Sequence, residues 1–287
     1  MTTETRDERR DHIHAMWASV AGGWAEHADY ADARGARITE RMLAEAAPTA
    51  GERVLELACG PGGLGIAAAE LIGPDGEVVL SDVAAEMTSV AAARAAARGL
   101  LNVSTVELDI EEIDQPDASY DVVLCREGLM FALDPATACA EIARVLRPGG
   151  RVSIAVWGPR ERNPWLGLVF DAVSAEVGMP LPPPGLPGPF ALSDADRLAG
   201  LLAGAGLADV SVGELEAPVR TGSFEEWWTR TTALAGPLAG LLAALPAETS
   251  DGIVQRLRES CAPYATASGG LEIPGVTLLA SARRPLG

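Results

Sequence analysis

The feature that most constrains the fold is a buried-strand pattern that ends abruptly in a glycine-rich turn. Residues 54–57 are apolar except for Glu56, and the run Cys59-Gly60-Pro61-Gly62-Gly63 follows before a helical pattern begins near Ile66. Glycine permits positive φ and has no Cβ, so the turn's backbone can approach a ligand closely. The next helix offers unpaired N–H groups at its start. The stretch therefore predicts a nucleotide-type ligand site at the carboxyl end of a parallel strand.

The identity of that nucleotide is not fixed by the turn alone. Gly60-x-Gly62-x-x-Gly65 also satisfies the dinucleotide fingerprint, which is a weak signal in isolation. Glu56 stands four residues before Gly60, inside the strand end. A carboxylate at this position suits a cationic ligand and would repel a pyrophosphate. This stretch therefore favours a cationic ligand over a dinucleotide and leaves both open.

Further strand and turn patterns follow in order. Residues 77–82 and 103–108 are strand patterns that end at Asp82 and just before Asp109, and residues 120–125 follow Asp117-Ala118-Ser119. An acid at the end of the second strand can accept both hydroxyls of a ribose, which fits either class of nucleotide. A helical pattern over 134–146, the turn Arg147-Pro148-Gly149-Gly150 and a strand pattern over 151–157 complete the series.

Together these motifs resemble the class I S-adenosylmethionine (SAM)-dependent methyltransferases. The matching features are the acid before a C-G-x-G-type turn, the Asp-Ala-Ser-Tyr-Asp-Val-Val run and the Leu-Arg-Pro-Gly-Gly turn, over roughly residues 34–157. The resemblance is closest to the ubiquinone/menaquinone-biosynthesis type. It implies an α/β fold with a Rossmann-like, doubly wound, seven-stranded sheet that is mostly parallel with an antiparallel last strand.

Three regions are expected around this sheet. Residues 1–33 are predicted to form an N-terminal cap, of which roughly the first twelve are charged and expected to be disordered. Residues 34–222 and 269–287 are predicted to form the SAM-binding core. Residues 223–268 are predicted to form a helical insertion before the last strand, acting as a substrate lid.

The resemblance implies a set of cofactor contacts. Glu56 would face the methionine end, Asp82 the ribose, and Met87 and Asp109 the adenine, while Arg126 would take the cofactor carboxylate. The complete predicted set is Glu56, Ala58, Gly60, Gly62, Asp82, Val83, Met87, Asp109, Ile110, Cys125 and Arg126.

Catalytic and substrate-binding candidates lie at the end of the fourth strand and outside the core motifs. Glu127 could act as a base or orient a substrate hydroxyl, and His14 and His27 could act as bases if the leading segment closes over the site. Solvated surface positions are the alternative for all three. Predicted substrate contacts, with ordinary packing as their alternative, are Trp17, Tyr30, Met130, Phe131, Trp165 and Trp228.

Composition restricts the partners. The chain has 22 basic and 40 acidic residues, a net charge of −18, which argues against nucleic acid and anionic membrane surfaces. Neither a membrane-spanning apolar run nor a signal-peptide pattern is apparent, so a cytoplasmic protein is expected. The four cysteines show no C-x-x-C spacing, which indicates neither a zinc site nor a disulfide framework.

The sequence therefore predicts a SAM-dependent methyltransferase that transfers a methyl group to O, N or C of a small molecule, expected to be uncharged and apolar or aromatic. Two alternatives remain: an NAD(P)-dependent oxidoreductase, and a SAM-binding protein on this fold without methyltransferase activity. The substrate, the acceptor atom, the use of a general base and the oligomeric state, a homodimer included, cannot be read from the sequence.

Overall fold

A computed structural model describes residues 5–182 and 186–286, and its centre is a seven-stranded sheet of order β3-β2-β1-β4-β5-β9-β6. Strands β1 to β5 run parallel to one another, whereas β9 runs antiparallel to both of its neighbours, β5 and β6. The predicted fold class is confirmed. The strands are β1 Arg53–Leu57, β2 Glu77–Asp82, β3 Val103–Glu107, β4 Tyr120–Arg126, β5 Leu146–Trp157, β6 Ala208–Glu216 and β9 Val276–Arg283.

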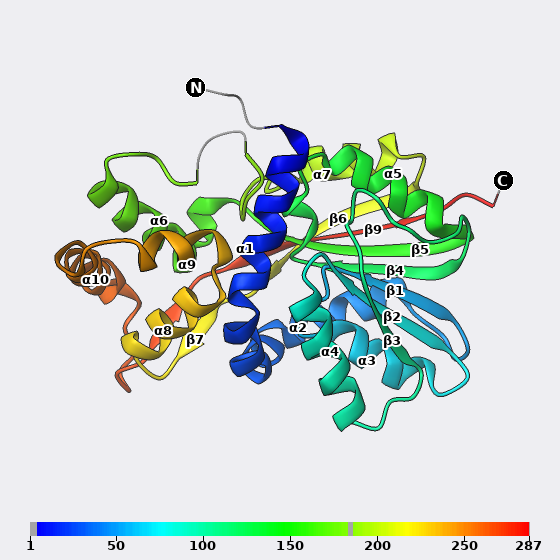
Figure 1. Ribbon diagram of the computed structural model, residues 1–287, viewed down its shortest axis with the longest axis horizontal. Coiled ribbons are helices and arrows are strands. Elements are labelled where there is room, and N and C mark those ends of the chain that lie inside the picture. Colours follow the sequence, from blue (N-terminus) through cyan, green and yellow to red (C-terminus); the bar gives the residue numbers. More distant parts are fainter. Residues whose placement is uncertain (1–4, 183–185, 287) are drawn as a thin grey trace.

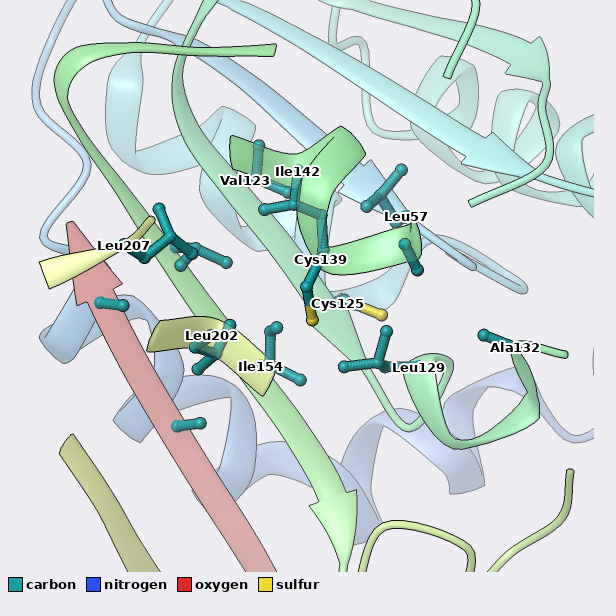
Figure 2. Packing of buried hydrophobic residues seen from close by; sticks show 14 of the residues in the cluster. Leu57, Val123, Cys125, Leu129, Ala132, Cys139, Ile142, Ile154, Leu202 and Leu207 are labelled. Carbon is teal, nitrogen blue, oxygen red and sulfur yellow. The ribbon is translucent and has the colours of Figure 1, made fainter. Parts of the chain in front are cut away.

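Helices cover both faces of this sheet (Figure 1). One face carries α2 (Ala28–Ala46), α3 (Gly63–Ile72) and α4 (Ala85–Ala97), whose apolar residues share a core with Val54, Leu80 and Leu124 of the strands. The opposite face carries α5 (Pro135–Val145) and α7 (Ala195–Gly204). Figure 2 shows this second core, in which Cys139 and Ile142 of α5 and Leu202 of α7 pack against strand residues such as Val123 and Ile154.

A separate group of helices extends from the carboxyl end of the sheet, on the left of Figure 1. Its own core includes the buried Trp165 and Trp227, and a two-stranded sheet of β7 (Val219–Thr221) and β8 (Leu271–Ile273) connects it to the main sheet. The helices are α6 Pro164–Val177, α8 Phe224–Leu234, α9 Gly236–Ala243 and α10 Ala247–Cys261, and the short 3-10 turns of the chain are Leu129–Phe131, Arg160–Arg162 and Ala262–Tyr264.

The N-terminal segment is more ordered than the sequence predicted. Helix α1 spans Arg6–Glu26, so the expectation of disorder up to about residue 12 is wrong for the described part, and residues 1–4 lie outside it. The physical reason is a capping box in which Thr5 and Glu8 satisfy each other's backbone N–H groups. In addition, Arg6 forms an ion pair with Glu111, 2.5 Å away. Helix α2 runs through residue 33, so the predicted boundary between cap and core falls inside a helix.

Other expected features can be checked against the described residues. None of the described helices has both the length and the hydropathy that crossing a membrane would require. All four cysteines are free and buried. Within residues 5–182 and 186–286, no group of three or more His, Cys, Asp or Glu side chains is arranged to hold a metal ion.

Candidate active site

A large cavity lies where α1 crosses the carboxyl ends of the parallel strands. Its empty space, with the solvent at the open mouth included, is about 1650 Å³. Residues of the first four strand ends line one half, and residues of α1, α2, α6 and α8 together with Trp157 line the other. We call these the strand-end half and the helical half. The cavity therefore offers a place for a nucleotide-type ligand beside the strand ends and for a second small molecule beside the helices.

Glu56 is a buried acid at the centre of the strand-end half. Its side chain is only 1% exposed, and its Oε2 accepts a hydrogen bond from the backbone N–H of Gly65, 2.8 Å away, at the start of α3. A Cβ on Gly65 would lie 2.5 Å from that oxygen, so only glycine allows this approach. Burial raises the pKa of Glu56 to about 8, although the Arg126 guanidinium opposes the shift. A cation bound beside Glu56 would restore its negative charge.

Asp82 connects the second strand to the glycine-rich turn. Its Oδ2 accepts from the N–H of Gly60 at 2.9 Å, and its Oδ1 accepts from the N–H of Ala84 at 3.1 Å. Burial raises the pKa of Asp82, whereas these backbone hydrogen bonds lower it. The carboxylate is therefore fixed in place with lone pairs left for ligand hydroxyls. Val83 and Met87, which follow it, also line the cavity.

The end of the third strand is held by α1. Arg10 donates from Nε to Oδ2 of Asp109 at 2.8 Å and pairs with Glu112 at 3.1 Å. His14 Nε2 lies 3.6 Å from the same Asp109 oxygen. The structure thus places His14 with the acid predicted to meet the adenine, and Ile110 lines the cavity beside them.

The ends of β1 and β4 are strained where they face each other. Ala58 has φ of 51° and Glu127 has φ of 59°, a left-handed conformation that side-chain-bearing residues rarely adopt. Gly128 packs directly against Ala58. A Cβ added at Gly128 would lie 2.4 Å from the Cβ of Ala58, which is too close for any residue with a side chain. Backbone strain of this kind tends to concentrate at functional sites. Glu127 lines the cavity, and its side chain makes no hydrogen bond within the described residues.

Arg126 connects the same region to α2. Its Nη1 donates to Oγ1 of Thr39 at 2.8 Å, and its Nη2 lies 4.0 Å from Asp32. Asp32 in turn pairs with Arg94 at 2.6 Å, and Arg94 donates to the carbonyl oxygen of Pro61 in the glycine-rich turn at 2.7 Å. These contacts fix α2 against the strand ends.

Aromatic side chains dominate the helical half. Trp17 and Phe131 meet edge to face with ring centroids 4.9 Å apart, and Trp157 and Trp165 do the same at 4.8 Å. The Arg230 guanidinium lies 4.2 Å from the ring centroid of Tyr30. All of these side chains line the cavity, which gives this half flat apolar walls suited to an aromatic or apolar molecule.

Some predicted residues are not brought into the cavity lining. His27 stands at the junction of α1 and α2, and Gly62 takes a positive φ at the start of α3, turned toward Leu80 and Ala91. Cys125 and Met130 are buried in the core under α5, because a strand directs alternate side chains to opposite faces and the following short turn points inward. Trp228 packs in the core of the helical group, next to Trp227. The remaining predicted residues line the cavity.

Several lining residues were not predicted from the sequence. Trp157 closes the fifth strand, so the rule that found Asp82 and Glu127 at strand ends could also have found it. Glu111 lies in the turn after the third strand, and the others come from helices, where an arginine gives no signal of its own. The main unpredicted ones are Arg10, Trp24, Arg34, Glu111, Trp157 and Arg230.

The order of the strand ends defines the class of protein. Along the edge β3-β2-β1-β4-β5, the lining residues are Asp109, Asp82, Glu56 with Ala58, Glu127, and Trp157. Two acids stand first, a buried acid comes next, and an aromatic wall comes last. This arrangement is that of a nucleotide-type site for a cationic cofactor, with space for an acceptor beside it. It fits a SAM-dependent methyltransferase.

Comparisons with known proteins agree with this class. Residues 54–150 match the family described as "Methyltransferase domain". The ubiquinone/menaquinone biosynthesis C-methyltransferase UbiE of Proteus mirabilis is 31% identical over 177 residues, which cover 61% of this chain and 70% of that protein. The chain belongs to the class I SAM-dependent methyltransferases. The glycine pattern is therefore assigned to a methyltransferase and not to a dinucleotide-binding oxidoreductase.

Solved structures support the same fold. The YcgJ protein of Bacillus subtilis has a TM-score of 0.60 at 20% identity, covering 87% of this chain and 98% of that one. The phosphoethanolamine N-methyltransferase 2 of Haemonchus contortus, in complex with SAM, has a TM-score of 0.53 at 20% identity, covering 87% of this chain and 52% of that one.

The residues present fit SAM as the cofactor. Glu56 is a buried carboxylate that lines the cavity, and burial raises its pKa to about 8, so a sulfonium or ammonium ligand bound beside it would favour its ionised form. Asp82 and Asp109 stand at the ends of the next two strands, in reach of one extended ligand.

Proposed function

We propose that this SAM-dependent methyltransferase acts on a small aromatic molecule bound in the helical half, with Glu127 receiving or orienting the acceptor's proton. One observation carries the proposal: the cavity is continuous from the acids of β1–β3 to the tryptophans of β5 and α6, and Glu127 stands on the strand between them. SAM, when bound, supplies a methyl group already activated on a sulfonium centre.

The chain's own residues have three tasks in this proposal. Glu56, Asp82 and Asp109 hold the cofactor along the strand ends, so that its methyl group faces the end of β4. The aromatic walls orient a flat acceptor and exclude water, and alignment of this kind can supply much of the rate enhancement. Glu127 holds the proton released from an O–H, N–H or activated C–H acceptor.

Glu127 is favoured over the histidines for that task. His14 lies beside Asp109, at the opposite end of the strand order from Trp157, and His27 does not line the cavity. Glu127 has no side-chain partner among the described residues, and its left-handed backbone is fixed by its N–H, which donates to the carbonyl of Ala155 at 2.7 Å. A free carboxylate on a rigid backbone suits proton transfer. The relative's name, a C-methyltransferase, favours a ring carbon as acceptor.

The test uses tritium-labelled SAM and a probe panel of naphthols, naphthylamines and naphthalene diols. We expect label to enter at least one aromatic acceptor, and Glu127→Gln to lower kcat for it by about 10²–10⁴-fold while the affinity for S-adenosylhomocysteine is unchanged. Glu107→Gln, an exposed acid at the end of β3, is the matched control and should retain wild-type kcat. Equal kcat in Glu127→Gln and wild type would remove Glu127 from the mechanism.

A further inference from the structure

The helical half contains a positive charge that no side chain of the described chain neutralises. Among the cavity-lining arginines, Arg10 pairs with Asp109, Arg126 lies near Asp32, and Arg230 pairs with Glu226. Arg34 of α2 has neither an ion pair nor a hydrogen bond within residues 5–182 and 186–286. Its guanidinium instead lies over aromatic rings, 4.1 Å from the centroid of Trp165 and 5.9 Å from that of Trp157.

A second donor without an acceptor lies at the same place. The Nε1 of Trp157 is buried and has no hydrogen-bond partner in the described part of the chain. The neighbouring Trp165 is satisfied, because its Nε1 donates to Oδ1 of Asn163 at 3.1 Å. A buried donor left unpaired costs free energy, and Trp157 adds to the excess of donors in this region.

The surroundings offer no anion to either donor. The acids that line the cavity belong to the strand-end half: Glu56, Asp82, Asp109, Glu111 and Glu127. The described lining from α2, α6 and α8, with Trp157, contains no acid: besides Arg34 it consists of Gly35, apolar and aromatic side chains, Arg230 and Thr231. A protein of net charge −18 thus has an excess of donors and positive charge in the half of its cavity assigned to the acceptor.

We propose that the acceptor substrate is an aromatic or apolar molecule that carries a carboxylate, and that Arg34 is the residue that selects it. This proposal rests on the assignment of the helical half to the acceptor, and it replaces the expectation of an uncharged one. Trp165 holds the guanidinium in place by stacking, and the planar guanidinium binds a carboxylate with two parallel hydrogen bonds.

The test is calorimetric binding to the full chain with saturating S-adenosylhomocysteine. The probes are 2-naphthoate and 2-naphthamide, which have nearly the same shape and differ in charge. We expect wild type to prefer 2-naphthoate, and Arg34→Gln to weaken it by about 10- to 100-fold without changing the affinity for 2-naphthamide. Arg34→Lys should recover only part of the loss, because lysine keeps the charge but not the planar geometry.

Arg37→Gln is the matched control. Arg37 lies on the same helix, is exposed, and donates only to the carbonyl of Glu216 at 3.4 Å. The Arg37→Gln variant should bind 2-naphthoate as wild type does. Circular dichroism and thermal unfolding should show that all variants are folded.

Three results would overturn the proposal. They are no preference of wild type for 2-naphthoate, equal binding by Arg34→Gln, and a parallel loss of S-adenosylhomocysteine affinity, which would make Arg34 a cofactor contact. Each of these results can be told apart from a failure of the proposed function. Methylation of neutral acceptors only, unaffected by Arg34→Gln, would refute the carboxylate proposal and leave the proposed function intact. Binding of 2-naphthoate that depends on Arg34, with no methylated acceptor in any panel, would refute the proposed function and leave the carboxylate proposal intact.

Discussion

The two halves of the cavity are built by different means. In the strand-end half, acids at the ends of consecutive strands are fixed by backbone N–H groups, as Glu56 is by Gly65 and Asp82 by Gly60. In the helical half, Trp157, Trp165 and Arg34 come from three separate elements and are held by ring contacts. The first half depends on sheet geometry and leaves little freedom in residue type. The second depends on packing between helices and can change its chemistry one side chain at a time.

The largest expected effect tests how rigid the strand-end half is. Asp82→Asn removes the charged acceptor that Gly60 and Ala84 engage and that a ribose would share. We expect a loss of about 2–3 kcal/mol in S-adenosylhomocysteine binding, about 100-fold in Kd, because hydrogen bonds to charged groups are the stronger class. Isothermal titration calorimetry measures it.

Glu77→Gln is the control for this variant. Glu77 begins the same strand, at the opposite end from the cavity, and pairs with Arg53 on the surface at 2.7 Å. Its cofactor affinity should match wild type. A Kd for Asp82→Asn within threefold of wild type would show that the strand-end half also tolerates a change of residue type, contrary to the difference described above.

The next effect, a change of about tenfold per pH unit in the affinity for SAM, is expected from the protonation of Glu56. With a pKa of about 8, the free protein carries this carboxyl mostly protonated at pH 7. The cation of SAM favours the ionised form, so binding releases a proton, and affinity rises with pH by up to about tenfold per unit between pH 6 and 7.5. Calorimetry in buffers of different ionisation enthalpy measures the proton release. Glu56→Gln has no proton to lose, so an unchanged release in that variant would contradict the assignment.

The smallest effect tests the contact that joins the two halves. Arg10 of α1 bonds to Asp109 and Glu112, so it holds the helical cap onto the strand ends. Arg10→Gln should raise the dissociation rate of S-adenosylhomocysteine by about two- to fivefold, since partly exposed ion pairs contribute about 1 kcal/mol or less. Stopped-flow displacement measures the rate. Arg9→Gln, its exposed neighbour, should behave as wild type, and equal rates in all three proteins would show that the halves open independently.

The strand-end half could be predicted because its signals are local. Glu56 is a carboxylate inside an apolar strand, and Asp82 and Asp109 follow strand patterns at positions where parallel strands must meet. Arg34 gives no such signal, because an arginine on an amphipathic helix is typical of a solvated surface. Its role depends on Trp157 and Trp165, which lie more than a hundred residues away in the chain. The first turns of helix α1, expected to be disordered, were missed for the same reason, since Arg6 and Arg10 are held by Glu111 and Asp109 rather than by apolar periodicity.

The position of α1 also determines when the pocket is completed during synthesis. Gly23 packs so closely on α8 that an added Cβ would lie 2.5 Å from the carbonyl oxygen of Ala233, and Trp17 lies against Gly236 at the start of α9. During synthesis, α1 therefore has no complete binding surface until about two hundred further residues have emerged from the ribosome. The parallel strands β1 to β5 can pair earlier, but the cover over the cofactor pocket docks only after α8 and α9 have emerged.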